Sequence, residues 1–179
     1  MKVFVTPLLI FLFCSLIIGC GAPEAPPPVN YDGPLTEGEN VEMFYTEKGV
    51  MKMKMNAKKV REFQSGDREF PEGIYLEFYD ENGKITSTLR ANYAYYYKAD
   101  DKWKGQGNVQ VKNIEKDDQL NTEELFWKPD TKRIFTEKFF TIRQKGDLIY
   151  GTNLDAAQDL SNYTFKNPEA DFLVEEEPN

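Results

Sequence analysis

The 179-residue chain contains no histidine, and its only two cysteines, Cys14 and Cys20, lie near the N-terminus. Without imidazole, the protein lacks the usual general base, the commonest metal ligand and any catalytic triad built on histidine. No thiol follows Cys20, so neither a disulfide nor a cysteine site can operate in the remainder of the chain. We therefore predict no metal site and no thiol chemistry in the folded part.

Positive charge is also scarce: 22 Lys and Arg residues against 30 Asp and Glu give a net charge of −8. This balance argues against non-specific attraction to nucleic acid or to an anionic membrane surface. Acidic pairs such as Asp100/Asp101 and Glu123/Glu124 could suggest a glycosidase. However, neighbours on a strand point to opposite faces, and these pairs fall in turns or beside a bend. The sequence thus predicts no enzyme and no cofactor.

The N-terminus has the layout of a secretory signal, with Lys2 before an apolar run from Val3 to Ile18. The run ends in "IIGC", which resembles a bacterial lipobox. We expect cleavage after a signal peptide at 1–19 and lipidation of Cys20. Residues 20–40, with "GAPEAPPPVNYDGP", form a Pro-rich tether. The folded domain is expected over 41–174, followed by an acidic tail at 175–179. An uncleaved membrane anchor is the alternative.

An internal repeat organises the rest of the chain. Segments around Ala57, Ala91, Thr122 and Gly151 superimpose, and these small residues recur at spacings of 34, 31 and 29. An apolar residue precedes each by two positions, and another follows each by three. Because regular strands alternate with period two, the step of three indicates a repeated corner or β-bulge.

Short alternating segments separated by turn signals such as "DENG" and "KPDTK" fill the intervals. Only "NAKKVREF" shows a moderate helical pattern. The pattern predicts an all-β protein: a twisted, open β-jelly roll or solenoid-like set of antiparallel sheets built from repeats of about 30 residues.

These motifs resemble those of the LptC family of lipopolysaccharide export proteins. The resemblance rests on Leu89–Tyr96, Gly107–Val111, Leu120–Trp127, Ile134–Thr136 and Ile149–Leu154, in this order. It implies a jelly roll that accepts lipopolysaccharide from an inner-membrane ABC transporter and its permeases, and passes it to an LptA-like periplasmic bridge protein. Well-studied members are anchored by a transmembrane helix, whereas this chain carries a lipobox. The protein is expected in the periplasm, lipid-anchored to the inner membrane as in the family, or alternatively to the outer membrane.

The apolar side of the repeated corner supplies the candidate lipid-binding residues. Those expected to point into a slot or its packed floor are Leu89, Ala91, Ala94, Leu120, Thr122, Leu125, Phe140, Ile142 and Ile149. The final strand region is expected to pair with a partner jelly roll through Tyr163, Thr164, Phe165, Lys166 and Asn167, since few charges blunt it. A structural or adhesin-like β-solenoid lipoprotein, with a filled interior and no lipid transport, is the alternative function.

Overall fold

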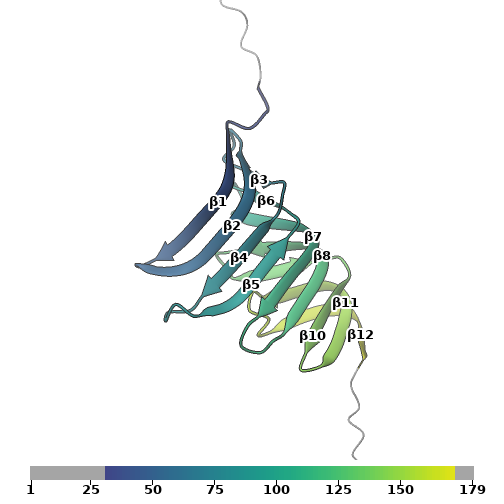
Figure 1. Ribbon diagram of the computed structural model, residues 1–179. Coiled ribbons are helices and arrows are strands. Elements are labelled where there is room, and N and C mark those ends of the chain that lie inside the picture. Colours follow the sequence, from purple (N-terminus) through teal and green to yellow (C-terminus); the bar gives the residue numbers. More distant parts are fainter. Residues whose placement is uncertain (1–30, 172–179) are drawn as a thin grey trace, which may run out of the picture. The chain divides into compact units, whose positions relative to one another are not determined.

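The computed structural model describes residues 31–171, so the expected signal peptide, Cys20 and the acidic tail lie outside the described residues. The described part contains no helix and is built from twelve strands of one antiparallel sheet (Figure 1), which confirms the all-β prediction. The strands are β1 (Thr36–Glu47), β2 (Val50–Glu62), β3 (Arg68–Phe70), β4 (Ile74–Tyr79), β5 (Ile85–Ala91), β6 (Tyr93–Tyr97), β7 (Lys102–Asn113), β8 (Gln119–Lys128), β9 (Arg133–Thr136), β10 (Phe140–Gln144), β11 (Asp147–Ala157) and β12 (Tyr163–Asp171).

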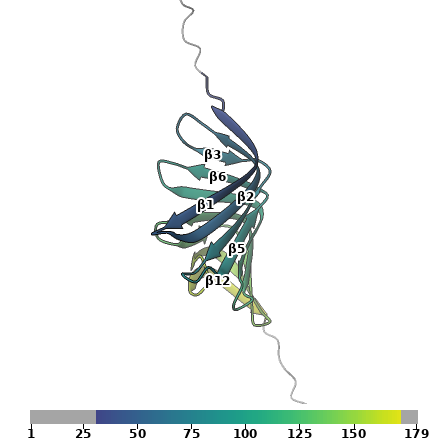
Figure 2. The same ribbon diagram turned by 60° about the vertical axis from the view of Figure 1, so that its left-hand side comes forward.

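The sheet is bent into two walls because its long strands change neighbours halfway along. β8, for example, pairs with β10 through residues 119–122 and with β9 through residues 126–128. The first wall contains β4, β5 and β10 with residues 50–57, 109–113, 119–122 and 147–151 of the long strands. The second wall contains β3, β6 and β9 with residues 59–62, 102–106, 124–128 and 154–157. Figure 2 shows β3 and β6 diverging from β5 on the opposite wall.

The four small residues of the repeat mark the bend. Ala57 and Ala91 both pair with Ile74, and each is the last residue of its strand to pair within the first wall. Thr122 and Gly151 occupy the same position on either side of Phe140. A Cβ atom on Gly151 would lie 2.7 Å from the carbonyl oxygen of Lys166, so a larger residue does not fit there. The predicted corner is therefore confirmed.

Left-handed backbone accompanies the bend in several strands. Between Gln106 and Val109 the β7–β8 register shifts by one residue, and the extra residue is accommodated by Gly107 and Asn108 with φ values of 72° and 48°. Asn153 in β11 and Asn167 in β12 also have positive φ, at 54° and 49°. Asparagine tolerates this region better than most side chains, which explains its recurrence at the corner.

The core lies between the two walls. Side chains from both walls meet there, as in the edge-on Phe78–Trp127 pair at 5.3 Å. Phe140 of the first wall meets Phe165 of β12 edge-on at 5.3 Å, and Phe70 stacks on Trp103 within the second wall at 5.4 Å. Leu120 on β8 pairs with Val111 on one side and Ile142 on the other, and all three are buried. The apolar periodicity of the repeat is thus the inner face of a folded sheet.

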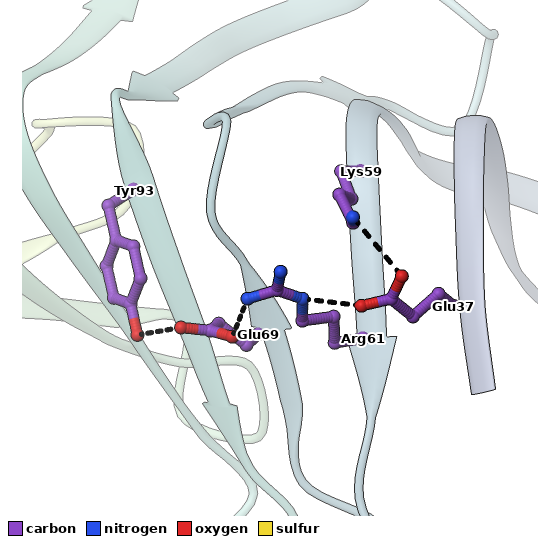
Figure 3. Close-up of polar contacts among 5 residues, drawn as sticks. All are labelled: Glu37, Lys59, Arg61, Glu69 and Tyr93. Atoms are coloured by element: carbon purple, nitrogen blue, oxygen red, sulfur yellow. Dashed lines mark hydrogen bonds and ion pairs between the residues drawn. The ribbon is translucent and has the colours of Figure 1, made fainter. Parts of the chain in front are cut away.

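On the outer surface, a row of polar contacts ties the N-terminal strand to the second wall (Figure 3). Glu37 of β1 accepts a hydrogen bond from Arg61 at 2.7 Å and pairs with Lys59 at 3.2 Å. Arg61 also pairs with Glu69 at 3.3 Å, and the Tyr93 hydroxyl donates to Glu69 at 3.2 Å. The Arg61 and Lys59 partners hold the pKa of Glu37 below its usual range.

One strand boundary and one secondary-structure assignment differ from the sequence expectation. The first strand begins at Thr36, ahead of the expected start at 41, because residues 36–39 pair with β2 through their main chain. These residues show no apolar alternation, so the sequence did not indicate a strand there. "NAKKVREF" lies mainly in β2 rather than in a helix, since Ala57 faces the core while Lys59 and Arg61 meet Glu37.

Candidate functional site

A groove with a volume of about 720 Å³ opens between the two walls. Met53 and Phe78 line it from the first wall, and Tyr96, Trp103 and Trp127 line it from the second. The side chains at 53 and 78 also pair directly across β2 and β4. The groove therefore lies on the open side of the bent sheet, away from the line of corners.

Aromatic rings form the floor of the groove. Trp103 and Trp127 pair across β7 and β8, and their ring centroids lie 6.0 Å apart. Phe78 meets Trp127 edge-on at 5.3 Å, which joins the first wall to the second. Tyr96 lies 4.9 Å from Trp103. This connected set of rings makes a rigid apolar surface, with Trp127 only 6% exposed.

Charged residues surround the floor at the mouth of the groove. Both signs occur there: Lys52, Arg68, Lys98, Lys132, Glu47, Asp101 and Asp130. Lys52 is ion-paired with Glu81, and Arg68 donates to Glu62 at 3.1 Å. The Tyr96 hydroxyl donates to Asp101 at 2.9 Å; burial and this carboxylate raise the pKa of Tyr96. An apolar floor under a charged rim can hold a molecule that is itself amphipathic.

The interior is closed beyond the groove, towards the C-terminal strands. The loop 158–162 joins β11 to β12 on the second wall. Its Asp159 carbonyl nevertheless accepts a 2.7 Å hydrogen bond from Asn113, which ends β7 on the first wall. Tyr163 similarly donates to Gln144 of β10 at 3.2 Å. Leu160 is 1% exposed and belongs to the core. The open side is therefore crossed by polar contacts at this end.

The nine expected inward residues lie in the packed interior. Eight are buried, and Ile149 is partly buried against the core. None of the nine lines the open groove; Leu89 and Leu125 border a much smaller apolar void beside Trp103 and Trp127. Their buried positions agree with the expectation that they pack the interior of the sheet. Contact with lipid stays a prediction for all nine.

Met53, Phe78 and Trp103 were not among the site residues predicted from the sequence. The strict alternation of "MKMKM" at residues 51–55 indicates an apolar face that includes Met53. No sequence signal showed that this part of the interior is left open, because openness depends on the distance between walls. The charged rim was likewise not predicted, since its residues come from three strands and two turns that are separate in the sequence.

The expected partner edge lies on the last strand. Within residues 31–171, β12 pairs only with β11, and β1 pairs only with β2, so both strands are at the ends of the sheet. Tyr163 and Phe165 of β12 pack against the core. Thr164, Lys166 and Asn167 are exposed. Pro168 lies in this strand, consistent with an edge position.

Two other kinds of functional feature, a metal-ligand cluster and a membrane-spanning helix, are absent from residues 31–171. Across residues 31–171, no three histidine, cysteine or acidic side chains gather as metal ligands would. In the same range, no helix has the length and apolarity needed to cross a bilayer.

Comparison with known proteins identifies the family. The family model described as "Lipopolysaccharide-assembly, LptC-related" matches residues 7–168, which include β1 to β11 and the part of β12 up to Pro168. No curated protein matches the chain. Members of this family are envelope components of lipopolysaccharide export and are not known as enzymes. With its bent all-β sheet and the matched span, the chain belongs to the LptC-related family of lipopolysaccharide-assembly proteins.

Proposed function

We propose that this protein receives lipopolysaccharide in the groove between its walls and passes it on along the sheet. The observation that carries the proposal is the open groove of about 720 Å³ with an aromatic floor and a charged rim. Its volume falls in the range of roughly 300–1,000 Å³ that is common for ligand sites.

The apolar floor supports the transport of acyl chains. Exposing a chain of about twelve carbons to water costs ~10 kcal/mol, at ~0.8 kcal/mol per CH₂. A carrier between two membranes must therefore offer apolar surface throughout the transfer. In the proposed complex, acyl chains lie against Phe78, Trp103 and Trp127, while the phosphorylated sugars stay at the rim and in water.

The proposed donor is an inner-membrane ABC transporter with its permeases, and the proposed acceptor is an LptA-like periplasmic bridge protein. The unpaired edge of β12, at Tyr163–Asn167, supports strand addition by the acceptor, because exposed main-chain groups favour such pairing. Lipidated Cys20 would hold the protein at the inner membrane, close to the donor. An outer-membrane anchor would instead place it near the end of the route.

Photocrosslinking tests the lipid site directly. A photoreactive phenylalanine analogue at Phe78 faces the groove, whereas the same analogue at Tyr75 lies on the same strand but on the exposed outer face. Illumination with lipopolysaccharide should give a crosslinked product from position 78 and not from position 75. Equal capture at both positions, or none at either, would support the alternative of a structural β-solenoid lipoprotein.

A further inference from the structure

The interior of the domain is divided into an open and a closed part. The groove ends at Trp127 and Gln158. Beyond them, Leu160 and the Phe140–Phe165 pair occupy the space between the walls. If acyl chains enter the groove and leave along β12, as in the proposed function, the loop 158–162 lies across their route.

The loop is attached to the second wall by more contacts than to the first. On the second wall, the Gln158 amide donates to the Lys132 carbonyl at 2.9 Å, and the Gln158 side-chain oxygen accepts from Trp127 at 3.0 Å. Arg133 of β9 also donates to the Asn162 side chain at 2.9 Å. On the first wall, the described side-chain contact is the 2.7 Å bond from Asn113 to the Asp159 carbonyl. Because Gln158 and Trp127 also line the groove, a ligand there touches the residues that hold the loop.

Three features lower the cost of opening the loop. Leu160 is buried with a φ of +58°, in the left-handed region that its side chain disfavours. The hydroxyl of Ser87, which pairs with Asn113 across β5 and β7, has no protein partner among the described residues. The same is true of one carboxylate oxygen of Asp118, although Gln144 donates to the other. Opening relieves the backbone strain at Leu160. In the proposed open state water also reaches these two oxygens, because Asn113 pairs with Ser87 and donates its amide to the Asp118 carbonyl.

We propose that the loop 158–162 is a gate between the groove and the exit strand. In the closed state, Leu160 fills the interior and Asn113 holds the Asp159 carbonyl. In the open state, the loop leaves the first wall, Leu160 withdraws, and acyl chains reach Phe165 on β12. The gate rests on the proposed function, because it regulates passage through the same interior.

The side chain that holds the loop to the first wall tests the gate. Asn113→Ala removes the 2.7 Å bond to the Asp159 carbonyl. Neither Asn113 nor Asp159 lines the groove, so the groove itself is left unaltered by this variant.

The readout uses the full-length protein with purified lipopolysaccharide as the probe. A photoreactive phenylalanine analogue replaces Phe78 in the groove or Phe165 beyond the loop. Asn113→Ala should raise capture at position 165 by about fivefold while leaving capture at position 78 unchanged, because the loop then loses its side-chain hydrogen bond to the first wall.

A second variant removes the plug itself. Leu160→Gly deletes the buried side chain and suits the left-handed backbone, so capture at 165 should again rise relative to capture at 78. Ser161→Gly, at an exposed position of the same loop, should change neither. Unchanged capture at 165 in both Asn113→Ala and Leu160→Gly, with capture at 78 intact, would overturn the gate alone. Absence of capture at 78 in the protein with the unaltered loop would overturn the proposed function itself.

Discussion

Trp127 is the point at which the two walls and the closing loop meet: its indole stands edge-on to Phe78 at 5.3 Å and donates to the Gln158 side chain at 3.0 Å. One side chain from β8 thus contributes to the groove floor and to the loop. Substitution should therefore affect packing and loop closure together.

Trp127→Phe should separate these two roles. Loss of the indole donor costs about 1 kcal/mol in the free energy of unfolding, in addition to the cost of a smaller ring. Amide hydrogen exchange at Gln158 should become faster, because the loop loses one of its contacts. Trp103→Phe is the matched control, since it reduces ring volume in the same floor and keeps the Trp127–Gln158 bond. Equal acceleration in both variants would show that the bond does not hold the loop.

Asn108 should be sensitive to side-chain shape although it is exposed. Its φ of 48° disfavours a β-branched residue. Asn108→Val should lower the free energy of unfolding by about 1–2 kcal/mol, measured by urea denaturation. Asn108→Gly should be close to neutral. If valine and glycine have the same effect, the corner does not depend on left-handed backbone at this residue.

Alkaline pH should weaken the N-terminal part of the second wall through Tyr93. Burial and the nearby Glu69 carboxylate raise the pKa of Tyr93 to about 12, from the ordinary value of 10.0. The protonated phenol is thus favoured by folding, so its contribution is complete below pH 10 and is lost as the pH rises through 12. The stability difference between the wild-type protein and Tyr93→Phe should be constant below pH 10 and should then shift in favour of the variant. A constant difference up to pH 12 would contradict the raised pKa.

Docking at the last strand should depend on its main chain. Thr164→Pro removes an amide donor from β12 and should reduce co-purification with the bridge protein and lipid transfer. Thr164→Ala, at the same exposed position, should be mild. Thermal unfolding of the isolated protein distinguishes lost docking from lost folding. If the proline variant folds and still binds, β1 at the opposite end of the sheet becomes the expected docking strand.

Lipidation is expected at Cys20, outside the described residues, because "IIGC" ends a short apolar run. Metabolic labelling with a fatty-acid analogue should mark the protein, and Cys20→Ser should abolish the label. A labelled serine variant would show that the lipid is attached elsewhere. Separation of inner and outer membranes by density then identifies the membrane that holds the anchor.

The repeat could be recognised from the sequence because the bend imposes a local requirement. Small residues at 57, 91, 122 and 151 are needed where each strand leaves the first wall, and the apolar step of three follows from the same geometry. The start of β1 could not be found in this way. Residues 36–39 are held by main-chain pairing and by the Glu37–Arg61 contact, and neither produces an apolar pattern.

The sequence also did not indicate that the interior consists of an open groove and a closed C-terminal part. Periodicity shows which side chains face inward, but the space between facing walls decides whether they enclose a groove. The segment "QDLSN" has the composition of an ordinary turn, and only the contact between Asn113 and Asp159, 46 residues apart, shows that it closes the open side. No sequence pattern therefore indicated that Leu160 is buried between the walls.

The shared corner has a consequence for how the domain comes apart. Since β2, β7, β8 and β11 each run through both walls, no backbone cut at a loop yields a fragment with one complete wall. The natural unit of division is instead a slice across both walls, equivalent to one repeat of the sequence. Such a molecule can gain or lose whole repeats in evolution, while the cross-section between the walls stays the same.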